Sequence, residues 1–234
     1  MASLTDLLLG LVALALFRRL PRDADASRYW RAMFAWVGAA GLGGAVHHAV
    51  LVGHPAVGRV AWAVLSTMVV VIVSYLLAAT VVEVLGRARA VVFWPLRMIS
   101  LLAYVGLAVT GRAGIGAIVA CEGVTMACVL GLWVWAFARH HPAARPMLVA
   151  IAASIGAAVF RLVPGISALV GLDSNAAYHL GQTVGMVLLA RAVVVSRTAQ
   201  VAVPRPLPAD RRAASDGGAA GNGRAPHTGP PPRR

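Results

Sequence analysis

Long apolar runs follow one another through almost the whole chain, and this pattern most constrains what the chain can fold into. A helix of about 20 apolar residues crosses the roughly 30 Å hydrocarbon core of a bilayer. Seven such runs extend over residues 3–17, 30–52, 57–85, 91–110, 115–138, 147–170 and 175–195, with short connections between them. The sequence therefore predicts an all-α membrane protein, a bundle of seven transmembrane helices over residues 3–198 in the cytoplasmic membrane.

The composition agrees with burial in lipid and excludes some chemistry. Charged residues make up 12% of the 234 residues, whereas soluble domains carry about 25%. All 21 basic residues are arginine, so the chain cannot form the lysine Schiff base of a retinal pigment, an aldolase or a pyridoxal enzyme. Cys121 and Cys128 are seven residues apart, about 10 Å on one helix, which is too far for a disulfide. They are expected to pack as small apolar side chains.

The arginines between the runs indicate the orientation of the bundle, because cytoplasmic loops collect basic residues. The second and fourth loops offer only Arg59 and Arg112. The odd-numbered loops hold Arg18, Arg19, Arg22, Arg28, Arg87, Arg89, Arg139 and Arg145. The N-terminus is therefore predicted outside and the C-terminus in the cytoplasm. The opening MASLTD has no basic residue, so the first run is predicted to be a retained helix rather than a cleaved signal peptide.

The end of the chain differs in composition from the rest. Residues 199–234 are predicted to form a disordered cytoplasmic tail, rich in arginine, proline and glycine from Pro204 onward. Its arginines could attract anionic lipid headgroups at about 1 kcal/mol each, or serve only solubility and orientation. Because the basic charge lies beside membrane spans, the bilayer is the expected partner and no nucleic-acid partner is expected.

Polar side chains inside the predicted helices gather at one depth. Ionisable groups within a bilayer cost several kcal/mol unless they are paired or hydrated, so each is a functional hypothesis. With the N-terminus outside, they fall in the outer half of the bundle, where His47 also lies. The predicted outward-facing polar pocket consists of Asp6, His48, Glu122, Arg161, Asp173, Asn175, Tyr178, His179 and Gln182.

Helical spacing places several of these residues on shared faces. Asn175, His179 and Gln182 stand at i, i+4 and i+7, a stripe that is expected to face inward. Gly44 and His48 share a face of the second run, where GAAGLGGA should let a neighbouring helix approach closely. For a single histidine an interhelical hydrogen bond is the simpler interpretation. Two histidines on different helices at one depth make a shared binding site equally plausible.

The remaining charges have simpler expected roles. Arg161 is expected to form an ion pair with Glu122 or to contact Asp173, and Pro164 frees a backbone carbonyl nearby. Arg97 is expected to extend to the inner interface, where Glu83 could pair with it or lie among headgroups. The expected surface residues are His140 and His141.

Residues 3–191 resemble the CREST superfamily of seven-helix membrane hydrolases, which contains the alkaline ceramidases and the progestin and adiponectin receptors. Within it, the chain looks most similar to uncharacterised bacterial proteins. The resemblance is carried by the seven runs, the opening TDLLLGLVALAL, GGAVHH at the end of the second run, and SNAAYHLGQTVGMVLLARA in the seventh. In that superfamily three histidines bind zinc, which activates a water that attacks an amide.

The resemblance implies zinc ligands at His48 and His179, but the other matching positions differ. Asn175 stands where the first histidine of the seventh span is expected, and the alternatives for that position are Ser174 and Asp173. Gly44 stands at the serine position, and the third run contains no aspartate. A carboxylate would have to complete a metal site, with three candidates: Asp6, Glu122 and Asp173.

Three functional hypotheses follow. In the preferred one, the protein is not hydrolytic, and its polar pocket binds a small or lipid-like ligand or holds the bundle together, with no cofactor expected. In the second, His48 and His179 hold zinc in a lipid amide hydrolase, and Arg161 binds an anionic group of the substrate. In the third, the same two histidines are axial haem ligands of an electron carrier. Ion transport is disfavoured because no inverted repeat is visible.

Overall fold

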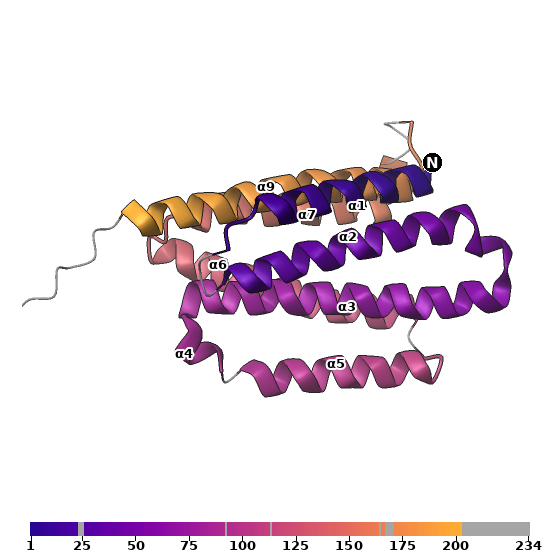
Figure 1. The fold of residues 1–234 in the computed structure, drawn as a ribbon, viewed down its shortest axis with the longest axis horizontal. Coiled ribbons are helices and arrows are strands. Elements are labelled where there is room, and N and C mark those ends of the chain that lie inside the picture. Colours follow the sequence, from indigo (N-terminus) through magenta and orange to yellow (C-terminus); the bar gives the residue numbers. More distant parts are fainter. Residues whose placement is uncertain (23–25, 92, 113, 164, 167–170, 203–234) are drawn as a thin grey trace, which may run out of the picture. The chain divides into compact units, whose positions relative to one another are not determined.

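The computed structural model describes residues 1–22, 26–91, 93–112, 114–163, 165–166 and 171–202, and within these every regular element is helical. Residues 1–200 form one compact unit. Its elements are shown in Figure 1. They are α1 (Ala2–Arg19), α2 (Ser27–Ala49), the short 3-10 helix η1 (Leu51–Gly53), α3 (Pro55–Leu85), α4 (Arg87–Ala90), α5 (Phe93–Val109), α6 (Ile115–Ala138), α7 (Ala144–Leu162) and α9 (Ser174–Ala202).

The all-helical, membrane-compatible fold class is confirmed. Four helical segments are long and apolar enough to cross a bilayer: Pro55–Leu85, Gly116–Ala138, Ala144–Arg161 and Ser174–Thr198. Helices also stand at the other three predicted places, but α1 carries Asp6, Arg18 and Arg19, and α5 has 17 residues. The count of seven crossings and the orientation therefore stay predictions.

Two helix ends differ from the sequence-based prediction. The sixth run was expected to reach residue 170, but α7 ends at Leu162, and the backbone of Val163 leaves the helical region with φ −121° and ψ 86°. The residue before a proline is disfavoured in the α conformation, and Pro164 itself lies outside the described residues. At the other end, α9 continues to Ala202, so residues 199–202 are helical rather than part of the predicted tail. Residues 203–234 of that tail lie outside the described part of the chain.

Glycines bring α1 and α2 into close contact. A Cβ atom added at Gly41 would lie 2.7 Å from the Cα atom of Gly10, and one added at Gly10 would lie 2.9 Å from the backbone nitrogen of Leu42. Helices approach this closely only where small residues face each other. The predicted close approach of a neighbouring helix to the glycine-rich face of α2 is therefore confirmed.

The other helices pack around α3 and α7. Helix α3 contacts α2, α5 and α6, and α6 contacts α7. Helix α9 lies against α7, where a Cβ atom at Gly181 would be 2.6 Å from the Cβ atom of Ala157. In Figure 1, α9 also runs beside α1. The chain thus brings its first and last helices together, which is what positions the candidate site.

The most deeply buried side chains lie toward the end of the bundle where α2 and α7 begin and α6 ends. Trp30, Phe34, Trp133 and Met147 are all 0% exposed there. The indole nitrogen of Trp133 donates a hydrogen bond to the hydroxyl of Thr80 at 3.3 Å. This end of the bundle is the predicted cytoplasmic side, so the large apolar core and the polar groups of the predicted pocket lie toward opposite ends.

Candidate functional site

Asp6 is the buried centre of the candidate site. It lies one helical turn before Gly10 on α1, and the close crossing of α1 and α2 leaves the residue only 3% exposed. A Cβ atom added at Gly44 of α2 would lie 3.2 Å from both Cγ and Oδ2 of Asp6. Any side chain at position 44 would therefore crowd the carboxylate, and the absence of the serine that the CREST resemblance implies leaves room for it.

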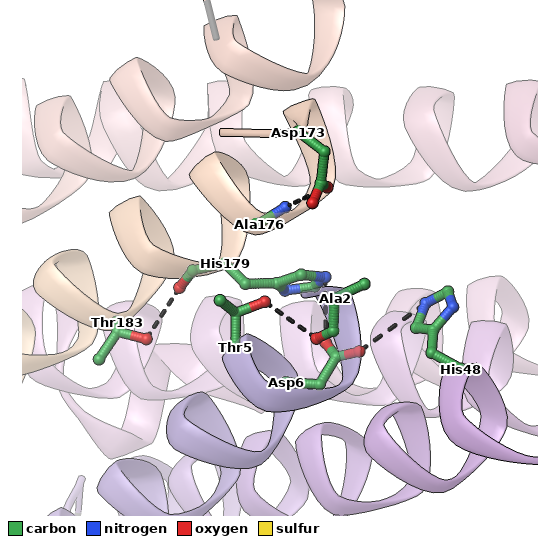
Figure 2. Close-up of polar contacts among 8 residues, drawn as sticks. All are labelled: Ala2, Thr5, Asp6, His48, Asp173, Ala176, His179 and Thr183. Atoms are coloured by element: carbon green, nitrogen blue, oxygen red, sulfur yellow. Dashed lines mark hydrogen bonds and ion pairs between the residues drawn. The ribbon is translucent and has the colours of Figure 1, made fainter. Parts of the chain in front are cut away.

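Two imidazoles from different helices face this one carboxylate, as Figure 2 shows. The Nε2 atom of His179 on α9 lies 3.0 Å from Oδ1 of Asp6, and the Nε2 atom of His48 on α2 lies 3.7 Å from Oδ2. The side chain of Asp6 is 5% exposed, that of His179 16% and that of His48 31%. We call these three residues the Asp6 cluster.

The contacts of the Asp6 cluster are uneven. At 3.7 Å, Nε2 of His48 is too far from Oδ2 for a hydrogen bond, and the contact is an ion pair only when the imidazole is protonated. No described group makes a hydrogen bond with Oδ2 of Asp6 or with Nδ1 of His179, although both atoms are buried. Buried polar atoms of native proteins nearly always have a hydrogen-bond partner. The cluster therefore retains capacity to bind a further polar group.

Arg161 and Glu122 do not form the expected ion pair. Arg161 is exposed in the last turn of α7, within electrostatic range of both histidines of the Asp6 cluster. Glu122 is half-buried on α6 and lies near Tyr178. Among the residues that the structure describes, Arg161 forms no ion pair with Glu122 or with Asp173. This prediction was wrong: the side chain of Arg161 is exposed at the end of α7 rather than buried beside a carboxylate.

The predicted residues of α9 have separate roles. The carboxylate of Asp173 accepts a hydrogen bond from the backbone N–H of Ala176 at 2.8 Å, which caps the start of α9. The ring of Tyr178 meets His179 edge-on, with centroids 5.0 Å apart. Gln182 donates a 3.4 Å hydrogen bond to the Ser154 carbonyl of α7. Asn175 is half-buried. Since His179 faces α1 while Gln182 faces α7, the predicted stripe does not act as one unit.

The Asp6 cluster does not fit a zinc ion or a haem. A catalytic zinc needs three protein ligands about 2.0–2.2 Å away and an open position for water, and no group of three His, Cys, Asp or Glu side chains among the described residues is arranged to hold a metal. A haem with two axial histidines needs its ring between the imidazoles, but the buried carboxylate of Asp6 occupies that place. The two imidazoles that could be metal ligands are both directed to Asp6 instead.

Sequence reasoning gave no role to His47, which is 8% exposed. Its ring lies 6.3 Å from that of Trp62 on α3 and 5.3 Å from that of His48, measured between centroids. Consecutive residues of a helix point about 100° apart, so one histidine of the pair faces α3 and the other faces the carboxylate on α1. This angular difference was the signal available in the sequence.

A second polar cluster joins α3 to α9 at the opposite end of the bundle. Glu83, with a 1% exposed side chain, accepts hydrogen bonds from the Ser196 hydroxyl and, at 2.7 Å, from the Arg197 guanidinium. The expected partner Arg97 instead donates to the Ser74 hydroxyl at 2.5 Å. The alternatives considered for Glu83 were therefore both wrong, because the seventh run was expected to end at residue 195 and α9 continues beyond it.

The fold and the site define a helical, membrane-compatible protein in which two imidazoles share one buried carboxylate near one end of the bundle. The chain belongs to a family described as a family of unknown function, DUF6962, which matches residues 1–198 and so includes the whole Asp6 cluster. No curated protein and no solved structure matches the chain significantly. The resemblance to the CREST superfamily stays a prediction.

Proposed function

We propose that the protein is a seven-helix protein of the cytoplasmic membrane whose Asp6 cluster forms an outward-facing polar site for a small or lipid-like ligand, without a hydrolytic metal. Four helices suited to crossing a bilayer support the membrane assignment. The distribution of arginine between the loops supports an external N-terminus. In this orientation Asp6, near the start of α1, lies in the outer half of the bundle.

The observation that carries the proposal is the contact of two imidazoles with one buried carboxylate. A buried carboxylate is tolerated when it has partners, and here its two partners come from two other helices, α2 and α9. His48 is the most accessible member of the cluster, and exposed Arg161 lies within electrostatic range of it. Both side chains can donate hydrogen bonds to an anion. The ligand is therefore expected to carry an anionic head, and the apolar body of a lipid-like ligand would lie in the surrounding bilayer.

Oleate, a simple lipid-like anion, tests the proposal with detergent-purified protein. A ligand that binds only the folded state raises the melting temperature, so oleate should raise the Tm of the wild type. The shift should be smaller in His48→Gln and in Arg161→Gln. It should be unchanged in Arg145→Gln, which removes an exposed charge at the start of α7. If oleate leaves the wild-type Tm unchanged, the cluster holds the bundle together and the binding proposal fails.

Metal analysis and an absorption spectrum of the same sample test the rival functions. The proposal predicts well under one zinc per chain and no haem absorption. One zinc per chain that is lost in His179→Gln would overturn the proposal in favour of a zinc-dependent amide hydrolase. A haem spectrum that is lost in the same variant would favour an electron carrier.

A further inference from the structure

An apolar groove lies between α2, α3 and α5, away from the Asp6 cluster. Its volume of about 460 Å³ is within the range of small-molecule sites, roughly 300–1,000 Å³. Thr67 is the polar residue of the lining, and its hydroxyl is already bonded to the carbonyl of Ala63 at 2.8 Å. The lining side chains used below are Trp36 of α2, Val60, Val64 and Met68 of α3, and Val105 and Val109 of α5.

The length of the groove matches one leaflet of a bilayer. Its lining on α3 runs from Val60 to Val71, which is about 16 Å at a rise of 1.5 Å per residue. Half of a hydrocarbon core of roughly 30 Å is about 15 Å. Val60, Val64 and Val109 of the lining are 66%, 55% and 83% exposed, so the described residues leave this surface open. One acyl chain of one leaflet fits it in length and in polarity.

Two arginines stand at the same end of the groove. Arg59 directly precedes Val60, and Arg112 follows Val109 by three residues; both are exposed. The backbone N–H of Arg112 donates to the Leu107 carbonyl at 2.8 Å, and Gly111 has a φ of +71°. This helix-ending geometry fixes Arg112 directly after α5. These are the two arginines of the predicted outer loops.

No acidic residue of the neighbouring sequence offsets these charges. Residues 50–82 and 99–121 contain neither Asp nor Glu. A phosphate at this end of the groove would therefore meet two cations, and Arg is well suited to phosphate.

A second copy of the chain is a poorer occupant of the groove. In a two-fold dimer within the membrane, the arginines of both copies would lie at the same depth and repel each other.

We propose that this groove binds an anionic phospholipid, with one acyl chain along Trp36, Val64 and Met68 and the phosphate between Arg59 and Arg112. The site rests on the membrane insertion of α3 and α5, which is part of the proposed function, but it is independent of the Asp6 cluster. Its ligand is selected by the charge of the headgroup. A zwitterionic phospholipid offers the same acyl chain with less electrostatic attraction.

Quenching of tryptophan by brominated lipids tests this site, because bromine on an acyl chain quenches an indole that it contacts. The full-length protein is placed in phosphatidylcholine nanodiscs that contain the same small fraction of either brominated phosphatidylglycerol or brominated phosphatidylcholine. The anionic lipid should quench the wild type more strongly. We call the additional quenching by the anionic lipid the excess. The excess should be lost in Trp36→Phe and retained in Trp62→Phe, which changes an exposed tryptophan outside the lining.

Charge variants complete the test. The excess should be lost in the double variant Arg59→Gln/Arg112→Gln and kept in Arg18→Gln/Arg19→Gln, which removes two exposed charges at the end of α1. Circular dichroism checks that each variant is folded. Asp6→Asn should also keep the excess, so that failure of the cluster and failure of the groove are separate results.

Three different results would contradict the lipid site, and each has its own meaning. Equal quenching by the two lipids, or an excess that persists in Trp36→Phe, overturns the lipid site while leaving membrane insertion intact. Quenching by neither lipid overturns insertion as well. A dimer whose Trp36 is shielded from both lipids identifies a second copy as the occupant and overturns the proposal.

Discussion

Asp6 is only 3% exposed, so its carboxylate depends on partners within the protein. Two imidazoles from different helices approach it. His179 is at 3.0 Å and His48 at 3.7 Å, so the two contacts are not equivalent. Loss of the nearer imidazole leaves a buried charge with a single distant partner. Loss of the carboxylate leaves both imidazoles without the acceptor that they face. The contributions of Asp6, His48 and His179 to the free energy of unfolding are therefore expected to depend strongly on one another.

The coupling is measurable by a double-mutant cycle. His179→Gln should lower the free energy of unfolding by about 1.5–3 kcal/mol, because it removes the hydrogen-bond partner that lies 3.0 Å from a buried carboxylate. The double variant Asp6→Asn/His179→Gln should lose less than the sum of the two single changes, measured by equilibrium unfolding in detergent. Asp173→Asn is the control and should be near neutral, since asparagine also caps helices well. Losses that add within about 0.5 kcal/mol would contradict a direct interaction.

The surroundings of His141 lead us to expect that the stability of the protein depends on pH. It lies in the connection between α6 and α7, its ring meets Trp133 edge-on at 5.6 Å, and its Nδ1 atom accepts a hydrogen bond from the Ala143 N–H. Burial lowers the pKa of His141 below its usual 6.5, although the carboxylate of Glu83 acts in the opposite direction. His140 is exposed as expected, whereas His141 is half-buried rather than the surface residue that the sequence predicted.

Because the folded-state pKa of His141 is lowered, the unfolded chain takes up the proton first as the pH falls. The contribution of the neutral ring is thus present above about pH 6.5 and is lost below that value. Melting temperatures between pH 7.5 and 5.5 should fall more steeply for the wild type than for His141→Gln. His140→Asn, which accommodates the positive φ of 56°, should behave as the wild type. Parallel profiles for wild type and His141→Gln would count against this role.

The sequence predicted some of these residues and not others for a geometric reason. Asp6, His48 and His179 could be grouped because depth along a helix follows from residue number and orientation. The expected Arg161–Glu122 ion pair is not formed, which shows that equal depth in the bundle does not by itself predict a contact. Two residues at one level meet only if their helices are neighbours and their faces turn toward each other. Helical spacing within one run cannot supply the rotation of one helix relative to another.

At the scale of the helices, the crossing of α1 and α2 places Asp6. Gly41→Ala would put a Cβ atom 2.7 Å from the backbone of Gly10 and 2.9 Å from the carbonyl of Asp6. Because both neighbours are backbone atoms, the helices must separate, and we expect a loss of about 1–3 kcal/mol in the free energy of unfolding. Gly131→Ala on α6, where a Cβ atom meets nothing within 4 Å, should instead gain up to about 1 kcal/mol from helix propensity.

Chemical unfolding of both variants in the same detergent measures this difference. Equal stability of the two variants would mean that α1 and α2 do not cross as closely as the structure has them. The prediction also links to the site, because a wider crossing moves Asp6 away from His48. The Tm shift with oleate should therefore shrink in Gly41→Ala and stay unchanged in Gly131→Ala.

Helix positions were more predictable than helix ends. The fifth run was predicted at 115–138 and coincides with α6. The apolar runs located the other long helices but not the end of α7 before Pro164, where a local backbone restriction intervenes. It also missed the extension of α9 to Ala202. There, Ser196 and Arg197 are polar in sequence but pack against Glu83 of α3, a tertiary contact that hydropathy cannot anticipate.

For the whole molecule, the decisive prediction is the orientation in the membrane. The odd loops hold eight arginines and the even loops two, which favours a cytoplasmic C-terminus. A reporter that is active only outside the cytoplasm should give no signal when fused after Arg212, and a signal when fused after Arg112 in the outer loop. Western blotting of both fusions controls for expression. A strong signal after Arg212 would reverse every depth assignment. The Asp6 cluster would then face the cytoplasm, and the arginines of the groove would meet the lipids of the inner leaflet.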